Sequence, residues 1–281
     1  MNKYHQLPSV AIVTSTIGRQ ELVRTIESVK NQNYPCKHYI FVDGEQFQHK
    51  VEELTKSYSD LIITYLPMNT GANGWVNSSI NAIAPYLIKE DIICYLDDDN
   101  WYEPNHIESI IQTFQEHPDA DFIYSMRNFF HVNNSFICED NMESLGFWEN
   151  KMIEPHTMFL HINNQSYSIK SKLNTNYHID TNCYAFKNNI AQILAPTWFT
   201  GILNDRNIFA KIVEVGLKGV STKKYTLNYT VDVSKFFNLK SLFQSIGEEY
   251  REDTYNEEIR MFREMNQENI RRYNNRTPWI E

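Results

Sequence analysis

Three consecutive acids, Asp97, Asp98 and Asp99, directly follow the short apolar run Ile92–Leu96. The run is apolar at every position and too short for a helix, which predicts a buried strand of a parallel sheet. Acids crowded at the end of such a strand repel one another and lose hydration, so we expect a cation beside them. Mg²⁺ and Mn²⁺ prefer oxygen ligands and suit this cluster when they share a phosphate with it. The alternative interpretation is a solvated acidic loop whose first Asp caps the next helix.

Polar residues also follow two earlier apolar runs. Val10–Val13 leads into Thr14 and Ser15, and His38–Val42 leads into Asp43. Helical spacing separates the runs, which is the pattern of βαβ units with a mainly parallel sheet. Right-handed crossovers place the loops after such strands at one edge, and ligands bind at that edge. We therefore expect these side chains and the three acids to surround one pocket.

The remaining periodicity completes an α/β fold. Further helices are predicted over Leu22–Val29, 51–58, Val76–Leu87, Ile107–Phe114 and the stretch between Gly201 and Gly216. Further strands are predicted at Leu61–Leu66, Asp121–Ser125, Tyr177–Phe186, Lys218–Ser221 and Tyr225–Val231. Residues 127–171 show little periodicity and are interpreted as loops and short strands that could hold an acceptor. Beyond Ser234 the chain is helical and heavily charged, which is more typical of packing or self-association than of catalysis.

Composition limits the function classes. The chain has 281 residues, of which 42% are hydrophobic, enough for one large domain or two small ones. Its net charge of -9 disfavours nonspecific binding to nucleic acid or to anionic membranes. No zinc site or disulfide framework is expected from the widely spaced cysteines, which are Cys36, Cys94, Cys138 and Cys183. Met1–Ser9 does not look like a signal peptide, and no run approaches the roughly 20 apolar residues of a membrane span, so we expect a cytoplasmic protein.

Four segments, taken in order, resemble family-2 glycosyltransferases with the GT-A fold. They are the first strand with Thr14–Arg19, the strand ending in Asp43 and Gly44, the loop Asn69–Gly71, and Leu96–Asp99. The resemblance covers roughly residues 8–220. It implies a Rossmann-like, mainly parallel sheet flanked by helices, with a C-terminal helical extension. The expected domains are a GT-A domain over 1–232, with a nucleotide half of about 8–126 and an acceptor half of about 127–232, and the extension over 233–281.

The resemblance implies transfer of a sugar from a nucleoside diphosphate to an acceptor hydroxyl. Carried over position by position, the implied nucleotide-binding residues are Thr14, Ser15, Asp43, Asn69, Gly71, Asp97 and Asp98. Within the acidic triplet, Asp97 would contact the ribose, Asp99 would coordinate Mn²⁺ or Mg²⁺, and Asp98 would assist. Positive charge at that place stabilises the departing diphosphate.

An inverting transferase also needs a general base near the acceptor hydroxyl. The family usually supplies it from an acidic pair at the start of a helix, and here Asn204 replaces the first acid, so Asp205 is the candidate. Asp205 could equally be a helix-start acid that complements the dipole. Asp180 is the rival base, or a residue that binds acceptor or sugar hydroxyls. Many family members have a later His as a metal ligand, whereas no His follows His178, so the metal would rely on Asp99, diphosphate and water.

Other residues carry weaker expectations. Arg127, Lys187 and Arg206 could contact phosphate or acceptor, although each is more often an ordinary ion-pair residue. Sugar stacking and core packing are both open for the three tryptophans Trp75, Trp101 and Trp198. Metal ligation is the less expected role for His156 and His178.

We therefore expect an inverting, metal-dependent glycosyltransferase that uses a nucleoside-diphosphate sugar, with a UDP-sugar as the first expectation. Synthesis of a surface polysaccharide is implied by the resemblance alone. The expected partners are a glycan or lipid-linked acceptor, a membrane surface touched peripherally, and a second copy paired through the C-terminal helix. A nucleotidyltransferase is the first alternative, although only Gly18 and Arg19 match its phosphate loop. The second is a noncatalytic nucleotide-sugar-binding protein, which Asn204 and the missing late His keep open.

Overall fold

A computed structural model describes residues 7–173, 177–251 and 254–281. Contacts divide the chain into two units, the first holding Met1–Met126 and Ile179–Leu227 and the second Arg127–His178 and Asn228–Glu281. Two of the boundaries fall inside continuous strands, β6 (Phe122–His131) and β11 (Gly219–Val231). The domain limits expected from the sequence, 1–232 and 233–281, stay a prediction.

The first unit is built on a mixed sheet with the strand order β3-β2-β1-β4-β10-β6-β11-β5. The strands not yet given are β1 (Val10–Thr16), β2 (Lys37–Val42), β3 (Ile62–Tyr65), β4 (Ile92–Tyr95), β5 (Trp101–Tyr102) and β10 (Tyr184–Lys187). β1 pairs in parallel with β2 and β4, and β2 with β3, as the βαβ pattern predicts. β10 runs antiparallel to both β4 and β6. The predicted α/β fold, with parallel strands β1 to β4, is therefore confirmed.

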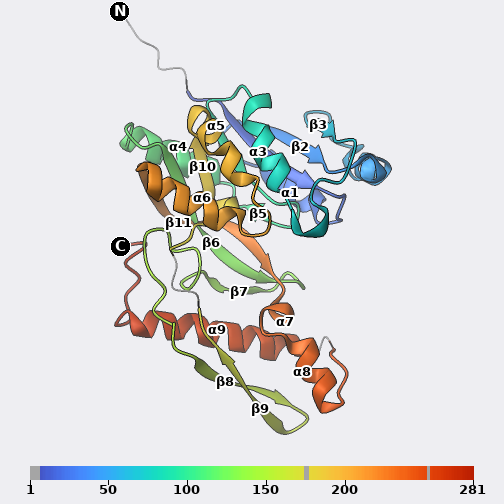
Figure 1. Cartoon of the computed structure of the whole chain (residues 1–281), viewed down its shortest axis with the longest axis vertical. Helices are drawn as coiled ribbons and strands as arrows, with labels where there is room; N and C mark the ends of the chain where they lie inside the picture. The colour runs from blue at the N-terminus through green and yellow to red at the C-terminus, as the bar shows by residue number, and fades with distance from the viewer. Residues whose placement is uncertain (1–6, 174–176, 252–253) are drawn as a thin grey trace, which may run out of the picture. The chain divides into compact units, whose positions relative to one another are not determined.

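Helices cover this sheet (Figure 1). They are α1 (Leu22–Lys30), α2 (Gln48–Thr55), α3 (Ser78–Leu87), α4 (His106–Glu116), α5 (Asn188–Trp198) and α6 (Asn204–Val215), with short 3-10 turns η1 (Glu45–Phe47), η2 (Ala72–Gly74) and η3 (Thr181–Cys183). α1 buries Leu22, Ile26 and Val29, which recur at helical spacing on one face. The first two pack with Ile40 and Val51 in a core between the helices and the edge of the sheet.

Three local features of the structure differ from the sequence prediction. The strand predicted over Tyr177–Phe186 is wrong for most of its length, because Asp180 accepts a hydrogen bond from the Asn182 amide and starts the turn η3. Helix α5 follows β10 and was not predicted. The two strands predicted after Gly216 are one strand, β11, in which Lys223 adopts a left-handed φ of 58°.

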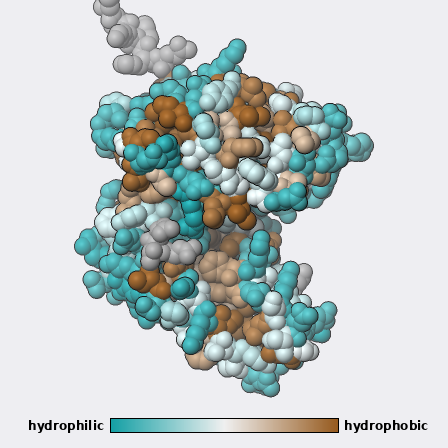
Figure 2. Space-filling view, viewed as in Figure 1, coloured by the Kyte–Doolittle hydropathy of each residue, from teal (hydrophilic) through white to brown (hydrophobic). Residues whose placement is uncertain are grey.

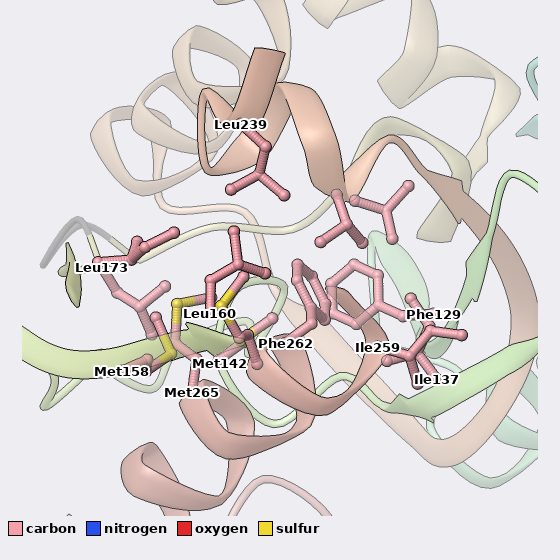
Figure 3. Close-up of a cluster of buried hydrophobic side chains, with 14 of the residues drawn as sticks. Phe129, Ile137, Met142, Met158, Leu160, Leu173, Leu239, Ile259, Phe262 and Met265 are labelled. Carbon is pink, nitrogen blue, oxygen red and sulfur yellow. The ribbon is translucent and has the colours of Figure 1, made fainter. Parts of the chain in front are cut away.

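The second unit combines the ends of β6 and β11 with a hairpin and three helices. Its own elements are β7 (Phe136–Glu139), β8 (His156–Ile162), β9 (Gln165–Ser171), α7 (Val233–Phe236), α8 (Leu239–Ile246) and α9 (Tyr255–Arg272). The predicted short strands and the C-terminal helices are thus present. Figure 3 shows Met158 and Leu160 of β8 meeting Phe262 and Met265 of α9 in one apolar core. Strand β8 and helix α9 therefore bury their apolar side chains against each other.

Apolar side chains also reach the surface of the first unit. Figure 2 shows hydrophobic residues among polar ones over the region where Figure 1 labels α3 and α5. The exposed members on these two helices are Ile83, Tyr86, Leu87 and Ile193. Within the part of the chain that the structure describes, no helix has the length and apolar character needed to cross a bilayer.

The contact between Gly219 and Phe122 yields a stability prediction. A Cβ added at Gly219 would lie 2.1 Å from Cζ of the buried Phe122 ring. That ring is held by Tyr184 and Phe186 at centroid distances of 5.8 and 5.5 Å, so it has little room to move. We expect Gly219→Ala to lower the free energy of unfolding by about 1–3 kcal/mol, measured by urea denaturation. Phe122→Leu should absorb part of this loss, and strictly additive effects in the double variant would contradict the packing argument.

Candidate active site

Asp98 joins the end of β4 to the loop after β1. Thr16 Oγ1 donates a hydrogen bond of 2.7 Å to Asp98 Oδ2 and accepts one of 2.8 Å from the Gly18 amide. Asp98 and Thr16 are both buried. The parallel pairing of β1 and β4 therefore brings the first loop and the acidic triplet together, as expected from their positions after neighbouring strands.

Asp43 holds the loop that contains Asn69 and Gly71. Its Oδ1 accepts hydrogen bonds of 2.8 Å from both the amide and the hydroxyl of Thr70, and its Oδ2 accepts one of 2.7 Å from the Gly71 amide. A Cβ at Gly71 would lie 2.2 Å from the Val76 carbonyl oxygen and 2.8 Å from Asp43 Oδ2. Only glycine fits there, so this side of the site has a fixed backbone shape.

Thr14 and Ser15 differ in their surroundings. Thr14 is fully buried, and its Oγ1 lies 2.9 Å from Nε2 of His38 on the adjacent strand β2. Burial lowers the pKa of His38 to about 3, so this ring is neutral. Ser15 is only half-buried. The hydroxyl of Thr14 is thus engaged inside the sheet, whereas Ser15 has access to solvent.

Asp97 is oriented by two neutral amides. Asn77 Nδ2 donates to its Oδ1 at 2.9 Å, and Asn182 Nδ2 donates to its Oδ2 at 2.8 Å. The Asp97 amide in turn donates to Asn182 Oδ1 at 2.5 Å. Burial and the negative charge of Asp99 raise the pKa of Asp97 to about 6. The amides fix the direction of this carboxylate without neutralising it.

Asp99 lies at the more exposed end of the triplet, with a side chain that is 32% accessible. Arg19 Nη1 lies 2.5 Å from Asp99 Oδ2 and 3.3 Å from Asp98 Oδ1. Arg24 contacts the main chain instead, because its Nη2 donates to the Asp99 carbonyl at 2.8 Å while its guanidinium stacks on Trp101 at 3.7 Å. Burial and the charge of Asp98 raise the pKa of Asp99 to about 6 despite the nearby Arg19.

This donor set fits a hard divalent cation. The pKa values of Asp97 and Asp99 are raised because burial and the neighbouring acids disfavour their ionised forms. A bound cation would favour those ionised forms. Carboxylate oxygens are the ligands that Mg²⁺ and Mn²⁺ prefer. Among the residues described, the three acids do not converge into one three-ligand cluster. Coordination by part of the triplet, completed by substrate oxygens and water, is the arrangement that suits this geometry.

A second acidic pair lies in the same unit. One carboxylate oxygen of Asp180 and one of Asp205 are within 4.8 Å of each other. Asp180 is buried, and its Oδ1 accepts hydrogen bonds from the amide and the side chain of Asn182 at 2.9 and 2.8 Å. Asp205 is half-buried in the first turn of α6, and its Oδ1 accepts from the Arg206 amide. Both candidate bases therefore come from neighbouring segments.

Asn182 connects the two groups of acids. Its Nδ2 donates to Asp97 and to Asp180 at 2.8 Å each, and the residue is fully enclosed. Asn77 makes a parallel connection, because it donates to Asp97 and accepts 2.9 Å from Asn204 Nδ2. Asn204 also donates to Ser78 Oγ, so it ties the start of α6 to the start of α3. The replacement of the family's usual acid by Asn204 therefore has a structural use here.

Sequence reasoning missed Asn77 and Asn182, and it considered Arg19 for binding only as part of the phosphate loop of a nucleotidyltransferase. The only local signal was the pair Asp180 and Asn182, whose spacing is typical of an Asx turn. Other residues weighed from the sequence have structural contacts. Arg127 is buried in the second unit on Asp140 and Glu143, Trp198 is in the core of the first unit, and Lys187 lies over Phe114. In the second unit, His156 Nε2 lies 3.2 Å from Glu264.

Solved structures share this fold. The S. aureus TarS 1–349 structure in complex with UDP-GlcNAc matches with a TM-score of 0.51, covering 87% of this chain and 68% of that one at 13% identity. A longer S. aureus TarS structure matches with a TM-score of 0.50 and is covered to 41%. At this identity the likeness shows the fold alone, which is that of GT-A glycosyltransferases.

Curated relatives match smaller parts of the sequence. A Haemophilus influenzae protein is 36% identical over 106 residues, which are 38% of this chain and 70% of that protein. The glucosyl-dolichyl phosphate glucuronosyltransferase of Haloferax volcanii is 30% identical over 114 residues, covering 40% of this chain and 35% of that enzyme. A glycosyltransferase of Methanocaldococcus jannaschii is 26% identical over 150 residues, about half of each chain. The last two are therefore matched over half of their length or less.

The family assignment rests on a longer match. The family model of "Glycosyl transferase family 2" matches residues 9–186. This range includes the loop after β1, Asp43, the acidic triplet and Asn182. These are the segments that the geometry brings to one edge of the sheet. The chain belongs to glycosyl transferase family 2 and is a glycosyltransferase.

Proposed function

We propose that this enzyme transfers a sugar from a nucleoside-diphosphate sugar, with UDP as the first candidate nucleotide, to an acceptor hydroxyl with inversion. The observation that carries the proposal is the pair of hydrogen bonds from Asn182 to Asp97 and Asp180, which links a cation-seeking triplet to a second acidic pair. Such a pairing suits a donor diphosphate at one end and an acceptor at the other. The donor class is supported by the UDP-GlcNAc complex of the structural neighbour TarS.

On the donor side, Asp99 would hold Mn²⁺ or Mg²⁺ and Asp97 would bind the ribose. Asp98, Ser15 and Thr14 shape the loop around the nucleotide, and Asp43 fixes the Asn69–Gly71 loop beside it. When bound, the divalent ion supplies positive charge for the diphosphate as the sugar leaves it. The two side-chain amides that donate to Asp97 keep its carboxylate from turning away.

On the acceptor side, we assign the general base to Asp205. It is the more accessible of the two acids, whereas Asp180 is buried and caps the turn η3. The base takes the proton of the acceptor hydroxyl while that oxygen bonds to the anomeric carbon. The bond from this carbon to the diphosphate breaks on the opposite face, so the configuration inverts.

Exposed apolar residues next to these acids suggest an amphiphilic acceptor. The rings of Trp75 and Phe199 are in tilted contact with a centroid distance of 4.8 Å, and Ile202 is 72% exposed two residues before Asn204. Exposed apolar surface of this kind marks binding regions for lipid or protein. We propose a lipid-linked or glycan acceptor of surface polysaccharide synthesis, bound beside these side chains with peripheral contact to a membrane.

Loss of the proposed metal ligand should abolish metal-dependent turnover. With purified protein, Mn²⁺ and a panel of nucleotide sugars, we expect Asp99→Ala to lower release of nucleoside diphosphate by about 100-fold or more, since it removes a stabilising charge. The exposed Asp60→Ala is the matched control and should match wild type. Unchanged metal dependence in Asp99→Ala would refute its role, and release of pyrophosphate would indicate nucleotidyl transfer instead.

The crowded carboxylates should also cost stability at neutral pH. Since the pKa of Asp99 is raised from 3.8 to about 6, the folded chain binds more protons than the unfolded chain between these values, and stability falls as pH rises through the window. Asp99→Asn removes this loss. After discounting for its one-third exposure, we expect the variant to be about 1 kcal/mol more stable at pH 7 and equal to wild type near pH 4. A pH-independent difference in urea unfolding would contradict this.

The two candidate bases are separated by their kinetic effects. We expect Asp205→Asn to lower kcat by about 100-fold or more while KM for the donor stays within twofold, because the base acts on the acceptor. Asp180→Asn should raise KM for the donor, because it disturbs Asn182 and through it Asp97. The reverse pattern, with Asp205→Asn fully active, would move the base to Asp180.

A further inference from the structure

Arg19 is the one side chain in the described site whose positive charge lies on the carboxylates of the triplet. Its Nη1 contacts Asp99 Oδ2 at 2.5 Å and Asp98 Oδ1 at 3.3 Å. The side chain is 48% exposed, so it reaches the acids from the solvent side. A half-exposed guanidinium is held by charge more than by packing, and such a pair is exchanged readily for another anion.

Arg24 lies near the same acids but is held by different contacts from Arg19. It donates to the Asp99 main-chain carbonyl and stacks on Trp101, so its position depends on backbone and ring contacts. Arg19 instead contacts the Asp99 carboxylate itself, at Oδ2, which is one of the two oxygens that the proposed metal ligand offers to a cation. A carboxylate oxygen that is 2.5 Å from a guanidinium nitrogen cannot coordinate a metal ion in the same arrangement, because the two positive groups would repel each other.

We propose that Arg19 and the divalent ion compete for Asp99, and that the donor diphosphate resolves the competition by accepting Arg19 as its own ligand. This inference rests on the proposed function. A planar guanidinium matches the oxygens of a diphosphate as well as those of a carboxylate. Arg19 therefore shields the acids when no nucleotide is bound and becomes a phosphate-binding residue when the metal enters with the donor.

The competition has a thermodynamic signature. When the metal ion binds alone, it has to displace Arg19 from Asp99, and Arg19 loses its partner. When nucleotide is also present, the displaced Arg19 binds the diphosphate instead. Nucleotide should therefore increase metal affinity, and part of that coupling belongs to Arg19. Removing Arg19 should make metal alone bind more tightly and should make metal and nucleotide less cooperative.

The test is a titration of purified full-length chain with Mn²⁺, alone and with UDP, followed by electron paramagnetic resonance of free Mn²⁺. From the usual strength of an exposed ion pair, we expect Arg19→Gln to bind Mn²⁺ alone about three- to fivefold more tightly than wild type. The increase in Mn²⁺ affinity caused by UDP should shrink by at least the same factor. Arg19→Lys should fall between the two, because it keeps the charge without the planar fork.

Lys50→Gln is the matched control. Its side-chain carbons lie beside Gly18, next to Arg19 in sequence, and the change removes the same charge. We expect its Mn²⁺ affinity to stay within a factor of about 1.5 of wild type, since the Lys50 side chain is exposed and its charge is screened by salt. Thermal melts in EDTA check that every variant is folded.

Two results would overturn the proposal. Equal Mn²⁺ affinities for wild type and Arg19→Gln would show that Arg19 does not compete for Asp99, and an equal gain in Lys50→Gln would reduce the effect to general electrostatics. Either leaves the proposed function intact if Asp99→Ala still abolishes Mn²⁺ binding in the presence of UDP. Absence of Mn²⁺ binding in all of these proteins with UDP would overturn both the competition and the metal role.

Discussion

Concentrated negative charge at the carboxyl end of β4 is the constraint on which this site depends. The acids sit where a buried strand leaves the sheet, so they lose hydration and repel one another, and the pKa values of Asp97 and Asp99 rise to about 6. The neighbours do not remove this charge. Asn77 and Asn182 orient Asp97 with neutral groups, and Arg19 reaches the triplet only from the solvent side. The fold thus holds negatively charged carboxylates, which attract cations, at a fixed position after β4.

The loop from Asn69 to Asn77 connects Asp43 with the acidic triplet. Asp43 holds the start of the loop through Thr70 and Gly71, and Asn77 at its end donates to Asp97. Between them, Val76 has a φ of 45°, an unfavourable conformation for a β-branched residue that costs about 1–3 kcal/mol. The contacts at both ends hold this backbone in place. A change at Asp43 would therefore be felt at Asp97 through one segment.

Local patterns carried the part of the fold that could be predicted from the sequence. Short apolar runs ending in Thr14, Asp43 and Asp97 indicated strands whose ends share an edge, and the structure has those strands. The contact of Asn182 with Asp97 spans 85 positions, and an asparagine inside a turn leaves no periodic signal. Helix α5 does have helical spacing, with Ile190 and Leu194 among its buried residues. It was not predicted, and the strand predicted just before it was too long.

The core of the second unit joins segments that lie far apart in the sequence. It takes Phe129, Met158 and Leu160 from the middle of the sequence and Phe262 and Met265 from near its end. A fragment that stops at residue 232 would keep the first set and lose the groups that cover it. Such a truncation would expose an apolar surface to solvent and would promote aggregation. Expression of the isolated first unit therefore calls for removing both internal and terminal segments, with new joins at β6 and β11.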